Sequence, residues 1–162
     1  MSRQHAAYGD DGLKYKYSGV TVAAKPWTPG LKHLKEIVEK HSGFKYNFVL
    51  VNRYRSCALL QFMCCSRYRD GQDKMGDHRD DEKELCKRTP IASFSLGAER
   101  DFVLKHVDRG KNKLEPVKIP LKAGTLLLMF APTNDLWVHG IPARAACKHP
   151  RINLTFRFVL PT

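Results

Sequence analysis

Two histidines and one aspartate are spaced like the ligands of a mononuclear metal site. His78 and Asp80 stand two positions apart in Asp77-His78-Arg79-Asp80, and His139 follows far downstream, on what we expect to be a different strand. Side chains two positions apart in an extended segment point to the same side. Two imidazoles and one carboxylate on one face of Fe(II) leave its other positions open for a co-substrate and dioxygen. The three residues therefore predict a non-haem iron site.

Two arginines close to the C-terminal end add a second signal. Arg151 and Arg157 are six positions apart and share a face if their segment is a strand, with Thr155 between them on that face. A guanidinium fork matches a carboxylate in a bidentate manner, so such a strand can hold a dicarboxylate. The alternative is a pair of solvent-facing arginines on an edge strand. Together with the metal ligands, the arginines favour an oxygenase that uses Fe(II), O2 and 2-oxoglutarate.

The elements that must position these residues are one helix and many short strands. Thr28 is expected to cap a helix that has Pro29 in its first turn and ends at Gly43. The apolar positions at helical spacing are Leu31, Leu34, Ile37 and Val38. The expected strands are Lys14–Tyr17, Asn47–Tyr54, Ile91–Leu96, Asp101–His106, Pro116–Leu121, Thr125–Phe130 and Asn153–Leu160. This order predicts an α+β domain with a β-sandwich or jelly-roll core, in which residues 108–113 form a basic hairpin loop.

One segment does not fit the strand pattern. Arg53-Tyr54-Arg55 recurs as Arg67-Tyr68-Arg69, and residues 56–66 between the two copies are largely apolar and lack alternation. We interpret residues 56–66 as an insertion. The alternative is an ordinary short buried helix.

Composition narrows the class of protein. The chain has 162 residues, which suits a single domain spanning 1–162. Its net charge of +12 favours a polyanionic partner such as nucleic acid over a merely basic surface.

The five cysteines are odd in number and no secretory leader is visible, so we expect free thiols in a reducing compartment. No apolar run reaches the roughly 18 residues that span a bilayer, so no membrane partner is expected. Nothing suggests a dimer, so we expect a monomer.

Several motifs together resemble one family. The runs Gly76–Glu82, Pro90–Ala98 and Pro150–Arg157 resemble the AlkB family of nucleic-acid oxidative demethylases. Tyr8–Asp10, Tyr15–Gly19, Lys25–Trp27 and Arg100–Val103 are most similar to a nuclear DNA-repair branch of that family. The resemblance covers nearly the whole chain except residues 56–66.

The resemblance implies a fold, a reaction and a location. It implies a double-stranded β-helix core that removes methyl groups from 1-methyladenine and 3-methylcytosine in DNA, in the nucleus. The reaction would use Fe(II), O2 and 2-oxoglutarate and release formaldehyde, succinate and CO2. His78, Asp80 and His139 would bind the iron. Arg157 would hold the distal carboxylate of 2-oxoglutarate, and Arg151 the carboxylate near the metal.

The resemblance also implies an Asn-x-Tyr pair that binds 2-oxoglutarate. Asn52-Arg53-Tyr54 matches this pattern, but Tyr68 has the family's spacing to His78. Strand context favours Asn52 with Tyr54, and Tyr68 remains the alternative tyrosine.

The remaining predicted residues concern the substrate. A base must leave the duplex to reach the iron, and Tyr15 and Tyr17 are candidates for the wall of its pocket, unless one of them is core. Ser18, Asp81 and Glu82 are further candidates, because a carboxylate suits a cationic methylated base; the alternative is a solvated acidic turn. The residues expected to contact DNA phosphates are Arg3, Arg109, Lys111 and Arg144.

Other functions stay open at this point. The insertion is compatible with a catalytically silent nucleic-acid-binding protein, and the iron and 2-oxoglutarate residues are compatible with an oxygenase that acts on RNA. The resemblance places a base-displacing hairpin N-terminal to the matched region, so single-stranded as well as double-stranded DNA is an expected substrate.

Overall fold

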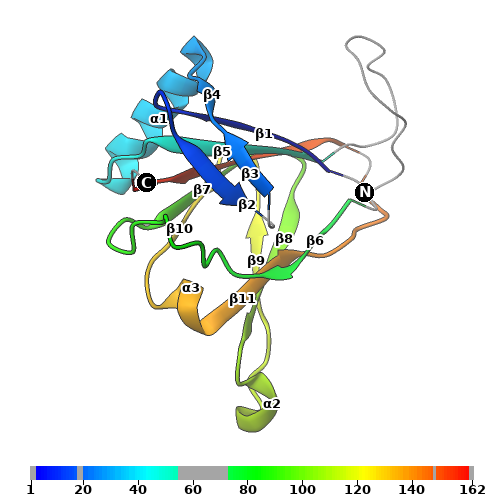
Figure 1. Ribbon diagram of the computed structural model, residues 1–162. Helices are drawn as coiled ribbons and strands as arrows, with labels where there is room; N and C mark the ends of the chain where they lie inside the picture. The colour runs from blue at the N-terminus through cyan, green and yellow to red at the C-terminus, as the bar shows by residue number, and fades with distance from the viewer. Residues whose placement is uncertain (1–2, 18–19, 55–72, 148, 161–162) are drawn as a thin grey trace.

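The core of the molecule is built from two β-sheets (Figure 1). The computed structural model describes residues 3–17, 20–54, 73–147 and 149–160. Its elements are β1 (Arg3–Gly9), β2 (Lys14–Tyr17), β3 (Val20–Ala23), β4 (Lys25–Pro26), α1 (Pro29–Ser42), β5 (Phe48–Tyr54), β6 (Met75–His78), β7 (Ile91–Gly97), β8 (Arg100–His106), α2 (Arg109–Asn112), β9 (Val117–Leu121), β10 (Leu126–Met129), α3 (Thr133–Leu136), β11 (Trp137–Ile141) and β12 (Arg151–Arg157). The segment 56–66 lies outside the described residues.

Sheet topology matches the expected jelly-roll. The larger sheet has the strand order β10-β7-β12-β5-β1-β4, and the smaller has the order β6-β11-β8-β9. All neighbouring strands in the two sheets are antiparallel except β1 and β4. A pocket lined from both sheets separates them. The predicted α+β class with a jelly-roll core is therefore confirmed.

Helix α1 begins and ends where the sequence predicts. The Thr28 Oγ1 atom accepts a hydrogen bond from the Leu31 backbone N–H at 3.3 Å, and Pro29 occupies the first turn. Gly43 ends the helix with a left-handed φ of 77°, and its N–H donates to the Glu39 carbonyl. A residue with a Cβ adopts this conformation only with strain, so glycine is suited to the position.

The helix packs on the outer face of the larger sheet. Side chains alternate between the two faces of a strand, and the outward residues of β5, β7 and β12 that pack against the helix are apolar. The buried cluster they form with the helix and the chain that follows it contains Val38, Tyr46, Val49, Ala92, Leu154 and Phe156. The inward residues of the same strands are therefore left to line the pocket.

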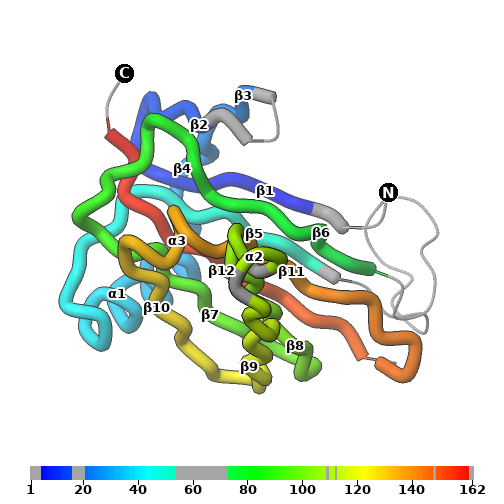
Figure 2. Tube along the Cα trace, turned by 90° about the horizontal axis from the view of Figure 1, so that it is seen from below, coloured from blue at the N-terminus to red at the C-terminus, as the bar shows by residue number. Residues whose placement is uncertain are grey.

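Some local features differ from the expectations. Strands β1, β3, β4 and β6 were not among the expected strands. The loop predicted at 108–113 contains the short helix α2, at the tip of the β8–β9 hairpin that projects from the body in Figure 1 and points toward the viewer in Figure 2. Cys86 and Cys147 are free thiols. None of the helices in the described residues is long and apolar enough to cross a bilayer.

Candidate active site

The two histidines are brought together by strand pairing. His139 on β11 lies directly opposite His78 on β6 in the antiparallel register, and their ring centroids are 4.3 Å apart. Directly opposed residues project to the same side of a sheet, which explains why positions so distant in the sequence share one site. Asp80 follows β6, and its Oδ1 atom lies 3.6 Å from His78 Nε2. One ligand atom from each of the three residues lies within 4.8 Å of the others.

The protonation states of the histidines suit metal binding. The Nδ1 atom of His78 lies 2.9 Å from the Gly76 carbonyl oxygen. A carbonyl only accepts, so this nitrogen carries a proton, and Nε2 is the ring atom left to bind a metal. Burial lowers the pKa of His139 to about 4, since the stacked Phe102 ring and the sheet exclude water. His139 is therefore a neutral imidazole at physiological pH.

Asp80 is held as a buried anion. Its side chain is only 2% exposed, and its Oδ2 atom accepts a 2.6 Å hydrogen bond from Arg157 Nη2. Burial by itself would raise the pKa of the Asp80 carboxyl, but the Arg157 guanidinium and the two histidines lower it below the ordinary value. The pKa of Arg157 is raised by Asp80 against the opposing effect of burial. The pair thus presents a carboxylate ligand without titration near neutral pH.

The donor set fits a divalent iron ion. Two buried atoms, Asp80 Oδ1 and His139 Nδ1, have no hydrogen-bond partner among the described residues. Unsatisfied polar atoms in a protein interior are costly, so their place in this triad suggests that a ligand completes the site. Two imidazoles and a single carboxylate form the facial set that non-haem Fe(II) prefers. The predicted ligands His78, Asp80 and His139 therefore lie together as expected.

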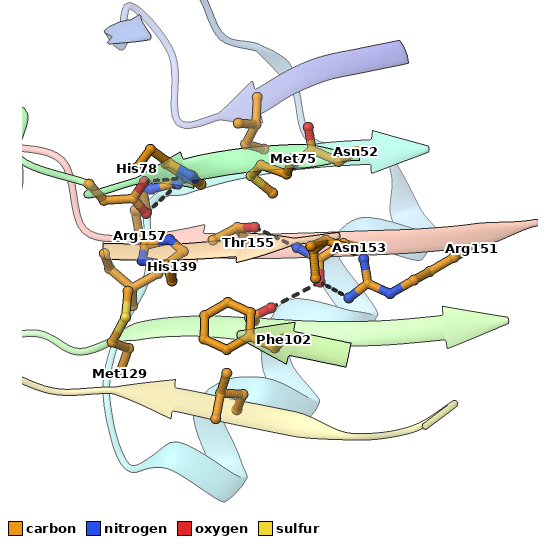
Figure 3. A pocket seen from close by; sticks show the side chains of 16 residues that line it. Asn52, Met75, His78, Phe102, Met129, His139, Arg151, Asn153, Thr155 and Arg157 are labelled. Carbon is orange, nitrogen blue, oxygen red and sulfur yellow. Dashed lines mark hydrogen bonds and ion pairs between the residues drawn. The ribbon is translucent and has the colours of Figure 1, made fainter. Parts of the chain in front are cut away.

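The two arginines also line the pocket, but in the opposite order to the one expected. Arg157 contacts the metal ligand Asp80, whereas Arg151 lies further along β12, as Figure 3 shows. The prediction that Arg157 holds the distal carboxylate and Arg151 the metal-proximal one was therefore wrong. The spacing of the arginines predicts a shared face, but not the direction in which the strand runs past the metal.

Arg151 is oriented by a polar network on the floor of the pocket. Its Nη2 atom donates to Ser95 Oγ at 2.9 Å and to Asn153 Oδ1 at 3.0 Å (Figure 3). Asn153 in turn accepts from Ser93 Oγ and donates through Nδ2 to Thr155 Oγ1 at 2.8 Å. Arg151 is 1% exposed. A buried guanidinium fixed in this way is suited to a carboxylate at the end of the pocket away from the iron.

Asn52 lies where the sequence predicts. It is buried, lines the pocket, and pairs across the sheet with Asn153. The backbone of Tyr54 lies at the end of β5 opposite Arg151. Its side chain and the whole of Tyr68 lie outside the described atoms, so both tyrosines remain predictions.

The pocket joins these groups in one space. It holds about 520 Å³, counted with its open mouth. The iron ligands stand at one end and Arg151 toward the other, and apolar side chains, among them Leu50, Phe102 and Ile141, line the rest. This arrangement can hold a small dicarboxylate between a metal and a buried arginine.

Tyr15 is core rather than pocket wall. Its ring is fully buried and packs against Phe48, with ring centroids 4.9 Å apart. The Arg157 guanidinium lies 5.3 Å from the centre of the ring, so Tyr15 contacts the arginine through a cation–π interaction. The expectation that Tyr15 faces a substrate base is therefore wrong, because its strand turns this side chain inward. The Tyr17 side chain and Ser18 lie outside the described atoms.

The acidic pair after the metal motif divides into two environments. Asp81 is exposed and lies 3.9 Å from Arg79. Glu82 is half-buried, and burial raises its pKa, an effect that the negative charge of Asp80 reinforces and the nearby Tyr15 hydroxyl opposes. Glu82 rather than Asp81 thus carries a carboxyl group into the interior beside the site.

The predicted DNA contacts lie apart from the pocket. Lys111 is exposed in α2, and Arg144 is exposed in the loop that follows β11. Arg109 stands in α2 and Arg3 in β1, and their side chains are not among the described atoms.

Several residues in or beside the pocket were not anticipated. Asn153 was detectable, because it stands between Arg151 and Thr155 in the alternating pattern. Ser93 and Ser95 follow the same alternation on β7, but a serine carries no signal of its own. Asn134 and Phe102 come from distant segments, and no local pattern connects them to the metal ligands.

The chain belongs to the 2OG-Fe(II) oxygenase superfamily, whose family model matches residues 1–157. This membership implies Fe(II), 2-oxoglutarate and O2, and the His78–Asp80–His139 triad fits the metal. Within that class, the chain is similar to the curated DNA oxidative demethylase ALKBH2.

The similarity to ALKBH2 extends over the whole chain. Identity is 48% with the protein of Bos taurus over 166 residues, covering 100% of this chain and 55% of that protein. It is 46% with that of Mus musculus, covering 100% of this chain and 64% of that protein. The human alpha-ketoglutarate-dependent dioxygenase alkB homolog 3 is 36% identical, over 98% of this chain and 52% of that protein. The chain thus spans 52–64% of the length of these relatives. The expected resemblance to AlkB enzymes is confirmed.

A solved structure supports the fold alone. The structure of OsALKBH1 superposes with a TM-score of 0.62 at 21% sequence identity, over 97% of this chain and 78% of that chain.

Proposed function

We propose that this chain demethylates 1-methyladenine and 3-methylcytosine in DNA by oxidation and thereby repairs alkylation damage. The observation that carries the proposal is the buried His78–Asp80–His139 triad in a chain 48% identical to a DNA oxidative demethylase. The net charge of +12 supports a nucleic-acid substrate.

The residues of the chain would prepare the site for that reaction. Asp80 stays ionised because Arg157 is hydrogen-bonded to it, His139 is a neutral imidazole, and the Gly76 carbonyl orients the His78 ring so that Nε2 is left for the metal. Arg151 would anchor one carboxylate of 2-oxoglutarate away from the metal, with Asn52 beside it. When bound, Fe(II) and 2-oxoglutarate allow O2 to hydroxylate the N-methyl group, with succinate and CO2 as co-products, and the hydroxymethyl group then leaves as formaldehyde.

Substrate recognition would rely on charge and shape. The 1-methyladenine and 3-methylcytosine bases carry positive charge, and a half-buried carboxyl such as that of Glu82 favours a cation nearby. Tyr17, Ser18 and Asp81 remain candidate contacts for the flipped base.

DNA would be held along its phosphates by basic side chains. Lys111 and Arg109 belong to the projecting β8–β9 hairpin (Figure 1), Arg144 is exposed in the loop after β11, and Arg3 belongs to β1. Binding through such contacts weakens steeply with added salt. We further propose that the protein works as a monomer, because nothing in its sequence suggests a dimer, and that it works in the nucleus, which follows from the resemblance alone.

The direct test is formaldehyde release from oligonucleotides containing 1-methyladenine, single-stranded and duplex, with Fe(II) and 2-oxoglutarate. Release that disappears in Asp80→Ala is expected. A folded protein that binds the DNA but releases no formaldehyde would identify a silent binder instead. Faster release from methylated RNA than from either DNA would indicate an RNA oxygenase.

A further inference from the structure

One side chain outside the metal triad holds the backbone of a metal ligand at two points. Asn134 lies in the short helix α3, which is far from Asp80 in the sequence. Its Oδ1 atom accepts a 3.1 Å hydrogen bond from the Asp80 backbone N–H, and its Nδ2 atom donates to the Asp80 carbonyl. Both polar groups of one peptide position are thus satisfied by a single amide side chain.

This double contact replaces a missing strand partner. β6 ends at His78, so Asp80 lies beyond the regular pairing of β6 with β11. Without a ladder, the backbone at Asp80 has no neighbouring strand to fix its rotation. An amide group offers one acceptor and one donor, as a strand neighbour does, and therefore fixes the backbone from which the carboxylate projects.

The α3 turn also connects to the other side of the site. Leu136, its last residue, is followed directly by β11, which carries His139. Its carbonyl accepts from the Val107 backbone N–H at 2.9 Å, which ties the turn to the chain just after β8. A second contact runs to the metal segment, because Arg79 Nη1 donates to the Asp135 carbonyl at 3.0 Å. One short turn thus fixes the position of Asp80 relative to the strand of His139.

We propose that Asn134 is a positioning residue for the metal, which sets the affinity of the site by holding the Asp80 backbone. It does not contact the ion itself. The inference rests on the metal site of the superfamily and is independent of the proposed DNA substrate. Partners that orient a metal ligand typically contribute 10–100-fold to metal affinity, and a contact with the ligand's backbone is expected near the lower end of that range.

The test is the affinity of the protein for Co(II), a redox-stable substitute for Fe(II), measured by titrating its visible absorption. Asn134→Ala removes both hydrogen bonds, and Asn134→Leu removes them while keeping a similar volume. Both should weaken Co(II) binding about 10-fold. Arg79→Ala, at a more exposed contact, should weaken it less. Thr133→Ala is the matched control, because no interaction of the Thr133 side chain occurs among the described residues, and it should bind Co(II) like the unchanged protein.

A purely structural role predicts a different result. In that case Asn134→Ala and Asn134→Leu would lower the melting temperature of the metal-free protein, yet bind Co(II) normally at a temperature where both are fully folded. That outcome would overturn the proposal. If neither variant folds, hydrogen exchange in the unchanged protein decides, since the Asp80 amide must then be protected and rapid exchange would refute the contact. Normal Co(II) binding without formaldehyde release would count against the demethylase proposal and leave this one intact.

Discussion

The two faces of β12 differ in chemistry, because alternating residues of the strand are apolar on one face and polar on the other. On the outer face, Leu154 and Phe156 are buried beneath α1 in an apolar cluster. On the inner face, Arg151, Asn153 and Arg157 are equally buried yet polar, and each is hydrogen-bonded. Burial is thus the same on both sides, and only the partners differ.

Because of this difference, the outer residues of β12 contribute mainly to stability and the inner residues mainly to ligand binding and chemistry. Buried apolar side chains stabilise the fold by leaving water and packing closely. Buried charges add little net stability, since their mutual attraction mainly offsets the cost of removing them from water. The inner face is therefore best explained by a ligand that the charges recognise. Changes on the outer face should reduce stability, and changes on the inner face should reduce binding and turnover.

The largest effect is expected for Arg157→Met, which should reduce both the stability of the fold and turnover. It leaves the buried Asp80 carboxylate without its 2.6 Å partner. Removing one member of a buried ion pair costs about 3–5 kcal/mol of stability, and the pKa of Asp80 should rise because Arg157 is the main group that lowers it. Turnover of 2-oxoglutarate should fall at least about 100-fold, the loss expected when a buried charge partner is removed.

Arg157→Lys separates charge from geometry at this position. A lysine restores the positive charge but not the guanidinium fork, so it should recover much of the stability and little of the turnover. Unchanged turnover in Arg157→Met would mean that the inner face is not specialised for the reaction.

A change on the outer face of β12 should reduce stability and leave binding of 2-oxoglutarate unchanged. Phe156 is fully buried, with its ring 6.1 Å from that of Tyr46. Phe156→Ala should lower the free energy of unfolding by about 3–5 kcal/mol through the lost burial and the cavity left behind. Urea unfolding measures this loss. The KM for 2-oxoglutarate should stay unchanged where the variant is folded, and a large rise would show that the two faces are coupled.

A smaller and more selective effect is expected for Asn153→Ala. Asn153 links Arg151 to Ser93 and Thr155, and its loss should leave the guanidinium poorly oriented. We expect the KM for 2-oxoglutarate to rise roughly 10-fold, equivalent to one charged hydrogen bond, and stability to fall by about 1 kcal/mol. Ile152→Val on the outer face is the control, with a comparable loss of stability but an unchanged KM.

Local patterns predicted much of this arrangement. The boundaries of α1 followed from Thr28 and Gly43, because caps are local chemistry. The shared face of Arg151 and Arg157 followed from strand alternation. The same alternation puts Asn153 on that face, but it was not predicted, because asparagine alone gave no reason to single it out.

The rest depended on tertiary contacts that no local pattern contains. Which arginine lies beside Asp80 depends on the direction of β12 relative to β6, which belong to different sheets. Tyr15 was a candidate for the substrate pocket or for the core because aromatic rings suit both, and only the packing against Phe48 decides between them. The hydrogen bonds between Asn134 and Asp80 join the single-turn helix α3 to the segment after β6, and neither is long enough for sequence periodicity to carry information.

The smallest predicted effect on stability concerns Glu39, a charged residue of helix α1 on the outer side of the larger sheet. Glu39 accepts from the Tyr46 N–H at 2.9 Å and from Lys45 Nζ at 2.8 Å. Burial opposes the shift, but these contacts and Lys35 lower the pKa of Glu39 below its ordinary value of 4.5. A carboxyl with a lowered pKa stabilises the fold above its unfolded pKa, and this contribution is lost as pH falls through the folded pKa.

Glu39→Gln keeps an acceptor for Tyr46 and removes only the charge. It should lower the free energy of unfolding by less than about 1 kcal/mol at neutral pH, since Lys45 is largely exposed. The difference from the unchanged protein should begin to shrink as pH falls below about 4.5, the ordinary value for this group, and should vanish below the lower folded pKa. Glu36→Gln, at an exposed position of the same helix, is the control and should change the free energy of unfolding little. A difference that stays constant from pH 7 to pH 3 would mean that the amide packs poorly and that the charge of Glu39 contributes nothing.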